Sequence, residues 1–280
     1  MPCPSNRAQV FRPKQQTGHI MRILITNDDG INAPGLKTLE GIAQELAGPD
    51  GEVWVVAPAF EQSGVGHKIS YTHPTMISQM GERRFAAEGS PADCVMAGLH
   101  DVLNGKDVDL ILSGVNRGNN SAENALYSGT LGGAMEGALQ GVPAFALSQY
   151  LGPDNFNITD PFEGAAQHGA DVVRKILAAK LDDKAPYKLF YNINFPPCPA
   201  KMVAGVKVAP QGIRPYTHFS VEAHLSPSGR KFLWARGTDQ RQGSAKGTDA
   251  AVNLENYISV TPMRADLTAH DALSALRVIE

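Results

Sequence analysis

Two adjacent carboxylates, Asp28 and Asp29, are the residues of this sequence whose position points most directly to chemistry. They follow residues 22–26 (RILIT), an apolar segment typical of a buried strand. In an open parallel sheet, ligands bind just beyond the carboxyl ends of the strands. Paired carboxylates there repel each other unless a cation or a shared proton relieves the charge. A helix-capping turn would explain one aspartate, but two in a row favour a metal, and oxygen ligands favour Mg²⁺ or Mn²⁺ over zinc.

Neutral oxygen donors follow two further apolar segments. The loop SGVNRGNN after residues 109–113 supplies Asn116 and Asn120, whose amides can complete a metal shell or bind phosphate without adding negative charge. The loop after residues 52–57 supplies the hydroxyl of Ser63, a weaker signal taken alone. An ordinary turn of glycine and asparagine is the alternative for the first loop. We expect both loops at the same edge of the sheet as the carboxylate pair.

Three residues that carry a hydroxyl group or no side chain begin a later predicted helix: Ser128, Gly129 and Thr130. Such a helix start presents backbone N–H groups that, with the hydroxyls, bind anions. N-capping by Ser128 or Thr130 is the alternative. Two glycines inside the helix, Gly132 and Gly133, each cost about 1 kcal/mol relative to alanine. We therefore expect close backbone packing or ligand approach at these two positions.

The elements that must hold these residues alternate between strands and helices. Strands are predicted over residues 22–26, 52–57, 109–113, 143–148 and 188–195. Helices are predicted from about residue 34, over residues 91–103, over about 130–140 and over about 161–181. This alternation predicts an α/β fold, with a mostly parallel sheet covered by helices on both faces.

The pattern changes after residue 205. Residues 206–209, 219–224 and 231–235 are typical of antiparallel strands, with a hairpin tip at 226–229. They predict a β-hairpin arm over about residues 211–246. A last strand at 257–261 and a helix at 265–276 are expected next, the helix within a C-terminal tail of about 262–280. Residues 1–20 are expected to be a disordered extension, which leaves one domain over 21–280.

Composition excludes several classes of protein. The chain has 280 residues, 42% of them hydrophobic, which is ample for one core, and a net charge of −3, which argues against a partner that is a nucleic-acid polymer. No apolar run approaches the ~20 residues of a membrane span, so no membrane partner is expected. Three cysteines without metal spacing predict a cytoplasmic protein rather than a disulfide framework.

Taken in order, the motifs resemble the SurE family, the survival-protein E nucleotidases. The resemblance rests on NDDG, AP followed by QSG, GSPADCV, SGVNRGNN, YSGT with its glycine-rich helix, and TD followed by YISVTP, from about residue 21 to about residue 262. One departure is Ser90, where the family's GTPADC-like motif has threonine. The loop after Ser63 carries His67 and Lys68, where the family varies, so the base preference stays open.

The resemblance implies a Rossmann-like core and metal-dependent hydrolysis of nucleoside 5′- and 3′-monophosphates, extended in some members to short polyphosphate. One divalent metal per subunit, Mg²⁺ or Mn²⁺, is implied on Asp28, Asp29, Ser63 and Asn116. The implied phosphate contacts are Asn116, Asn120, Ser128, Gly129 and Thr130. Family members form homodimers and homotetramers that exchange the hairpin arm and the C-terminal segment between subunits.

These residues leave some questions of mechanism and function open. We expect Asp28 and Asp29 to be catalytic, with a metal-bound water as nucleophile and with Asp28 as a metal ligand and candidate base. A phospho-aspartate on Asp28 is the rival route. The alternative function is a non-catalytic nucleotide or polyphosphate sensor. A dinucleotide oxidoreductase is excluded because NDDGIN stands where GxGxxG is required. Arg214, His218 and Arg236, near the arm, could reach the site or line a subunit interface.

Overall fold

A computed structural model of the chain describes residues 19–181, 184–215, 219–237 and 239–280. Its first unit is a strand, a helix and a parallel strand: β1 (Arg22–Thr26), α1 (Pro34–Ala47) and β2 (Glu52–Pro58). Proline occupies the first turn of α1, where a missing N–H costs nothing. The apolar stripe of α1 is buried, as its helical spacing predicts.

Within the described residues the main sheet has nine strands, in the order β3-β4-β2-β1-β5-β6-β7-β11-β8. The strands not yet given are β3 (Ile77–Gly81), β4 (Arg84–Ala87), β5 (Leu110–Arg117), β6 (Ala144–Gln149), β7 (Phe190–Phe195), β8 (Gly205–Val208) and β11 (Tyr257–Met263). Neighbouring strands from β4 to β7 run parallel, whereas β3 and β11 are antiparallel to β4 and β7. The expected mostly parallel sheet is confirmed, and β3 and β4 are additions to it.

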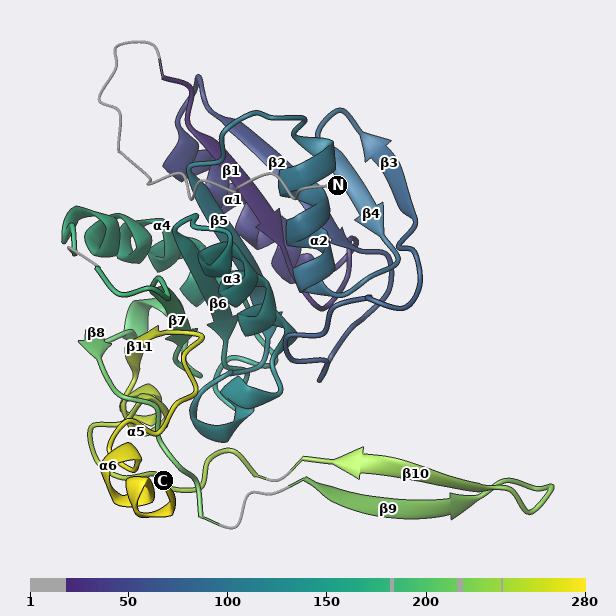
Figure 1. Ribbon diagram of the computed structural model, residues 1–280, viewed down its shortest axis with the longest axis vertical. Helices are drawn as coiled ribbons and strands as arrows, with labels where there is room; N and C mark the ends of the chain where they lie inside the picture. The colour runs from purple at the N-terminus through teal and green to yellow at the C-terminus, as the bar shows by residue number, and fades with distance from the viewer. Residues whose placement is uncertain (1–18, 182–183, 216–218, 238) are drawn as a thin grey trace.

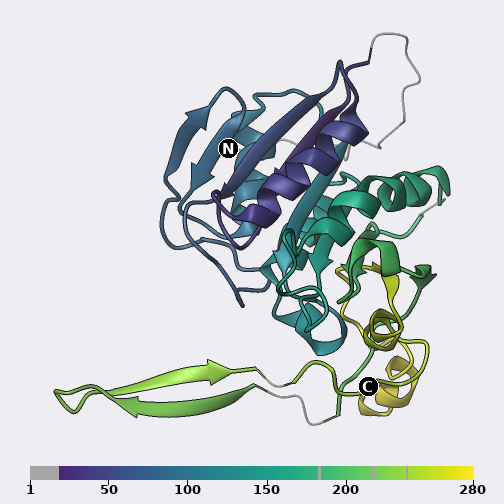
Figure 2. The ribbon, with the colours of Figure 1, turned by 180° about the vertical axis from the view of Figure 1, so that it is seen from behind.

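Helices cover both faces of this sheet, as predicted. They are α2 (Pro91–Ala97), α3 (Gly129–Leu139) and α4 (Glu163–Ala178) besides α1, with α5 (Asp249–Leu254) near the end of the chain. Figure 1 shows α2 and α3 on one face, and Figure 2, from behind, shows α1 and α4 on the other. Each face has its own buried cluster, which includes Leu36 and Val173 on the α1 side and Val95 and Leu131 on the α3 side. The result is a three-layer α/β architecture.

The strand β5 is longer than the predicted 109–113 and runs on through Arg117. Gly114 and Asn116, expected in a loop, therefore belong to the strand, and Asn116 pairs with Ser148 of β6 across a register shift. The extension carries Asn116 to the carboxyl edge of the sheet on a strand. This is a firmer support than the predicted turn.

Two expectations for the C-terminal part are wrong. The strand β8 pairs in parallel with β11 and not with the arm, because an alternating pattern does not encode strand direction. The helix expected at 265–276 is reduced to α6 (Leu273–Leu276), with a 3₁₀ turn at Arg277–Ile279. Asp266 accepts hydrogen bonds from the Thr268 N–H and from His270, a local arrangement that competes with helix.

The predicted arm is present as a two-stranded antiparallel hairpin of β9 (Ser220–Leu225) and β10 (Lys231–Arg236) that projects from the body (Figure 1). Its tip closes where the Ser226 N–H donates to the Arg230 carbonyl at 2.8 Å. Most of the expected extension, residues 1–18, lies outside the described residues, as does His218. Among the helices of the described residues, none has the length and apolar character needed to span a membrane.

Candidate active site

The polar loops after three neighbouring strands meet the start of α3 at one edge of the sheet. β2, β1 and β5 are parallel neighbours, so their carboxyl ends lie side by side. The Gln62 N–H donates to the Asp28 carbonyl at 2.7 Å, which ties the loop after β2 to the loop after β1. The Arg117 N–H donates to Asp29 Oδ2 at 3.0 Å, which ties the end of β5 to the same loop. The convergence expected from the sequence is therefore present.

Asp28 is buried and bound to the first turn of α3. It is 4% exposed, and the Thr130 hydroxyl donates to its Oδ1 at 2.7 Å. The Thr130 N–H donates to its Oδ2 at 3.1 Å. A carboxylate at this position also faces the positive end of the helix dipole. Thr130, predicted to contact phosphate, is thus the partner that orients Asp28.

Burial and neighbouring negative charges raise the pKa values of the carboxylate pair. Burial raises the pKa of Asp28 to about 6, the charge of Asp29 adds to the rise, and the Thr130 hydrogen bonds oppose it. Burial likewise raises the pKa of Asp29, against the hydrogen bond from Arg117. A cation beside a buried and a half-buried carboxylate, both with raised pKa values, stabilises their charged forms. The electrostatics of the pair therefore fit a metal site.

The other two predicted metal ligands, Ser63 and Asn116, are each next in sequence to a residue that bonds to the Asp28–Asp29 segment. The Ser63 hydroxyl donates to Glu61 Oε1 at 2.8 Å, so its lone pairs remain for a cation. Asn116 Nδ2 donates to the Gly118 carbonyl at 2.9 Å, which leaves its Oδ1 for a ligand. Across the described ranges no cluster of three His, Cys, Asp or Glu side chains could hold a metal. The donor set is of carboxylate, hydroxyl and amide oxygens, which suits Mg²⁺ or Mn²⁺.

The predicted phosphate-binding residues at the start of α3 divide into different roles. The Ser128 hydroxyl accepts a hydrogen bond from the Leu131 N–H at 3.1 Å and so caps the helix, while its own proton remains available. Among the described residues, the Gly129 N–H has no hydrogen-bond acceptor, and it stands in the turn that binds anions in other helices. Of the two capping alternatives, the one for Ser128 is correct.

Asn120 is the predicted phosphate contact held most firmly by its neighbours. Its Nδ2 donates to Ser148 Oγ at 2.8 Å, and its N–H donates to Asn194 Oδ1 at 2.7 Å. Asn192 Nδ2 donates to its carbonyl at 2.8 Å. Ser148 is also the sheet partner of Asn116, so Asn116 and Asn120 lie near each other. Side chains of β6 and β7 thus fix the position of the loop that carries Asn120.

Glycines in α3 allow backbone to approach where any side chain would collide. A Cβ at Gly132 would lie 2.3 Å from the Gly66 carbonyl oxygen. A Cβ at Gly133 would lie 2.9 Å from Ser113 Oγ. The close packing expected at both positions is confirmed. The Gly66 N–H also donates to the Tyr127 carbonyl at 3.0 Å, which places the loop that carries Ser63 directly against the start of α3.

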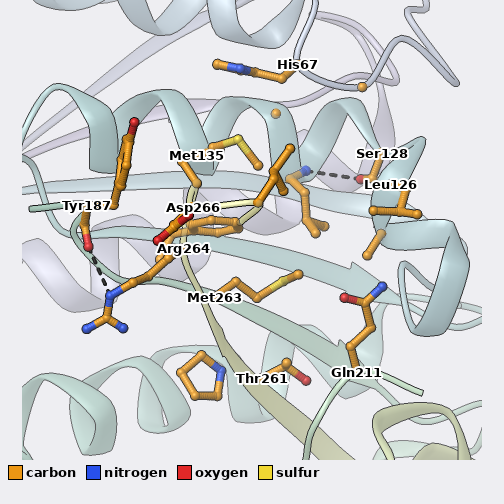
Figure 3. A pocket seen from close by; sticks show the side chains of 18 of the residues that line it. His67, Leu126, Ser128, Met135, Tyr187, Gln211, Thr261, Met263, Arg264 and Asp266 are labelled. Carbon is orange, nitrogen blue, oxygen red and sulfur yellow. Dashed lines mark hydrogen bonds between the residues drawn. The ribbon is translucent and has the colours of Figure 1, made fainter. Parts of the chain in front are cut away.

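A largely apolar cavity of about 970 Å³ lies beside the start of α3 (Figure 3). Figure 3 shows His67 and Ser128 on one side, with Gln211 and Thr261 on the other. Residues 264–267 of the C-terminal tail also line it. Neither carboxylate of the pair is among its lining residues. The cavity is therefore a neighbour of the carboxylate centre, separated from it by the first turn of α3.

Three parts of the site have no signal in the sequence. Glu61 pairs with Ser63, Arg117 contributes only its backbone N–H, and the Oε2 of Glu136 in α3 lies 2.8 Å from His67 Nε2. The first is a local side-chain pair, whereas the second depends on the main chain and the third on a contact between distant segments. A motif of residue types does not encode either.

The raised pKa of Asp28 predicts how the stability of the metal-free protein depends on pH. The folded pKa of about 6 exceeds the ordinary value of 3.8 for an aspartate, so the native state binds the proton more tightly than the unfolded chain does. The contribution of Asp28 to stability is present below pH about 4 and is lost as the pH rises through about 6, by at most about 3 kcal/mol. With a chelator present, Asp28→Asn should be more stable than wild type at pH 8, and the difference should shrink toward pH 4. Denaturant titrations measure this difference, and a value independent of pH would contradict the electrostatic account.

Comparisons with known proteins give consistent results. A family model described as Survival protein SurE matches residues 23–218. The protein named 5′-nucleotidase SurE of Ruegeria pomeroyi is 69% identical over 257 residues, which is 92% of this chain and 99% of that protein. That of Cereibacter sphaeroides is 68% identical over 259 residues, 92% of this chain and 99% of its own. A crystal structure of the SurE protein from Aquifex aeolicus aligns with a TM-score of 0.75 and 34% identity over 92% of this chain and 99% of that one.

Proposed function

The chain belongs to the survival protein SurE family, and we propose that it is a 5′-nucleotidase that hydrolyses nucleoside monophosphates with one divalent metal per subunit. The observation that carries the proposal is the adjacent pair of a buried Asp28 and a half-buried Asp29, with Asp28 joined through Thr130 to the start of α3. The shared name of the Ruegeria and Cereibacter relatives supports the substrate class. Hydrolysis of 3′-monophosphates and of short polyphosphate would use the same centre.

We assign the metal to Asp28, Asp29, Ser63 and Asn116. All four are oxygen donors at one edge of the sheet, and the raised pKa values of the carboxylates support a cation between them. When bound, Mg²⁺ or Mn²⁺ would neutralise the charge of the phosphoryl oxygens and assist attack on phosphorus. The choice between these two metals rests on metal-substitution assays.

The residues around the carboxylate pair would hold the phosphoryl group. The Gly129 N–H and the proton of the Ser128 hydroxyl can each donate to a phosphoryl oxygen. Asn120 is fixed by Ser148 and Asn194 and can offer little movement, which suits preorganised binding. Thr130 would act through Asp28, since both its hydroxyl and its N–H donate to that carboxylate. The predicted contacts thus divide into direct donors and a positioning residue.

The hydrogen bonds of the two carboxylates favour water over Asp28 as the nucleophile. Both oxygens of Asp28 accept hydrogen bonds from Thr130, which holds the group as a ligand and lowers its nucleophilicity. Asp29 is partly exposed and, among the described residues, accepts one hydrogen bond, from Arg117. We assign to Asp29 the acceptance of the proton released as water attacks.

A single-turnover reaction with AMP and Mn²⁺ in ¹⁸O-labelled water tests the proposal. The proposed hydrolysis places one labelled oxygen in the phosphate that is released. Hydrolysis of a phospho-aspartate at phosphorus would label the phosphate in the same way, so the reaction is also quenched in acid. A phosphoryl group found covalently bound to Asp28 would establish the phospho-aspartate route instead. Metal-dependent binding of AMP without phosphate release would identify a nucleotide sensor and contradict the proposed enzyme.

We propose that the hairpin arm and the tail bind a second copy of this chain, in a homodimer or homotetramer. A two-stranded hairpin is marginally stable by itself in water. This arm also exposes apolar side chains: Leu225, Leu233 and Trp234 have relative exposures of 72%, 62% and 65%. Phe219 at its foot packs edge-on against Tyr127, the residue before Ser128, at 4.9 Å between ring centroids. A partner that covers the arm would therefore also adjoin the phosphate-binding turn.

Replacing Leu233 by aspartate should shift the assembly toward smaller species. The substitution puts a charge on the apolar face of β10, and burying an unpaired charge costs several kcal/mol. Light scattering coupled to size-exclusion chromatography measures the mass, with Ser228→Asp at the exposed tip as the matched control. A wild-type protein that is monomeric at micromolar concentration would contradict the proposed assembly.

We also propose a cytoplasmic location. In the described part of the chain, Cys94 and Cys198 are free and buried. Burial raises the pKa of both thiols, so they stay protonated and unreactive. Free thiols of this kind suit a reducing compartment, and cell fractionation tests the proposal.

A further inference from the structure

A buried arginine, Arg214, stands at the foot of the arm against the loop that follows β5. It is 2% exposed. Its guanidinium donates to the Ser121 carbonyl at 3.1 Å, to Ser121 Oγ at 2.7 Å and to Asn119 Oδ1 at 3.0 Å. It also contacts Glu123 Oε1 at 3.2 Å, and the Arg214 N–H donates to Glu123 Oε2 at 3.1 Å. One side chain therefore spans several acceptors of a single short segment.

A buried charge is weak evidence for stability, because an apolar residue of similar size often stabilises as much. A planar guanidinium nevertheless does something that an apolar residue cannot, since its fixed fork sets the relative positions of the acceptors it binds. The acceptors of Arg214 belong to residues 119–123. The arginine therefore specifies the conformation of this segment.

The middle of the segment is held in an unfavourable backbone conformation. Ala122 has φ +53°, in the left-handed region that residues with a Cβ rarely adopt. Its N–H donates to Asp249 Oδ2 at 3.0 Å, and its carbonyl accepts from Gln211 Nε2 at 2.9 Å. Asp249 is fully buried and also accepts the Gly212 N–H at 2.8 Å. Residues on both sides of the arm thus hold Ala122 in place.

This segment links the two groups of proposed phosphate contacts. Asn120 lies at its start, and the 3₁₀ turn Ala122–Leu126 leads from it to Ser128 and Gly129. A change in the conformation of Ala122 or Ser121 would therefore change the separation of Asn120 from the α3 turn. When the groups that hold the phosphoryl group are misplaced by about 1 Å, the reaction rate can fall about a hundredfold.

From this geometry we propose that Arg214 and Asp249 are positioning residues of the nucleotidase, which fix the spacing between Asn120 and the Ser128–Gly129 turn. The inference rests on the proposed function, because the phosphate contacts belong to it. Neither residue touches the carboxylate pair in the structure. Their effect should therefore fall on phosphate binding and turnover, with little effect on the metal.

The test compares Arg214→Met, Arg214→Lys and Asp249→Asn with wild type. The methionine variant should lower kcat/KM for AMP by about ten- to a hundredfold. It should weaken inhibition by inorganic phosphate by a similar factor and leave the Mn²⁺ concentration for half-maximal activity within twofold. Lysine keeps the charge but not the fork, so it should recover part of the loss. Val173→Ala, buried in α4 on the opposite face of the sheet, is the control for lost stability.

Binding of inorganic phosphate to the Mn²⁺-loaded protein, measured by calorimetry, gives a second readout without turnover. If wild type binds phosphate but releases none from AMP, the proposed function fails, and the binding data alone decide the role of Arg214. A folded Arg214→Met protein with phosphate affinity within threefold of wild type would overturn the inference. An equal loss in a Val173→Ala protein of matched thermal stability would also overturn it. Should Arg214→Met not fold, the same thresholds apply to Asp249→Asn and Arg214→Lys.

Discussion

Replacing Asp28 by asparagine is expected to lower kcat for AMP by at least about a hundredfold, with the fold unchanged. The amide is nearly the same size as the carboxylate and can keep both contacts to Thr130, because the hydroxyl of Thr130 can reverse its role. What the substitution removes is the negative charge. Without that charge the proposed metal loses its buried ligand, and weaker metal binding leaves the charge of the phosphoryl oxygens unneutralised.

Steady-state phosphate release over a range of Mn²⁺ and Mg²⁺ concentrations measures the effect. Asp171→Asn, on the exposed surface of α4, makes the same chemical change far from the site and should leave the rate unchanged. The metal concentration needed for half-maximal activity should rise strongly for Asp28→Asn alone. Normal turnover by this variant would mean that the reaction occurs elsewhere in the molecule.

Gly129→Ala is expected to lower kcat/KM by about ten- to a hundredfold. A Cβ at this position would lie 2.9 Å from Asp28 Cβ and 3.1 Å from Val65 Cγ2, closer than carbon atoms approach. Asp28 would have to move away from Thr130, or the loop that carries Ser63 would have to shift. In an ordinary helix, replacing glycine by alanine stabilises the protein by about 1 kcal/mol. Here the steric clash predicts a loss of stability instead.

The control for this substitution is Gly41→Ala in α1. A Cβ at Gly41 meets nothing within 4 Å, so the variant should gain up to about 1 kcal/mol in stability and keep full activity. Thermal denaturation and AMP hydrolysis on both proteins make the comparison. Equal activity of the two variants would show that Asp28 tolerates a side chain against it.

The central part of the fold could be predicted because its signals are local. The strand at 22–26 and the helix from Pro34 are confirmed as β1 and α1, since apolar spacing and a proline in the first turn act within the element itself. The short strands β3 and β4 were not predicted. Their mostly exposed or half-buried residues lack the continuous apolar run of a central strand.

The direction of β8 depends on a partner some fifty residues further along, in β11. No pattern within residues 206–209 carries that information. The tail has less helix than the predicted 265–276 for a related reason. Its apolar residues Leu267, Leu273 and Leu276 are all exposed in the single chain. An amphipathic spacing stabilises a helix only when its apolar face packs against something.

The motifs predicted which residues lie together at the site, but not which partner each residue contacts. Asp28, Asn120 and Ser128 lie on loops that meet, as the order of the motifs implies. The binding of Thr130 to Asp28 could not be foreseen, because a threonine in a helix start binds a phosphate or a carboxylate equally well. The clamp by Arg214 joins residues about ninety positions apart, beyond the reach of any local pattern.

The most direct test of the proposed centre is anomalous diffraction from crystals soaked in Mn²⁺, recorded at the manganese absorption edge. We predict one strong peak per subunit, enclosed by the oxygen atoms of Asp28, Asp29, Ser63 and Asn116, and its loss in Asp28→Asn crystals. A fully active protein whose only manganese peak lies away from these four residues would contradict the account.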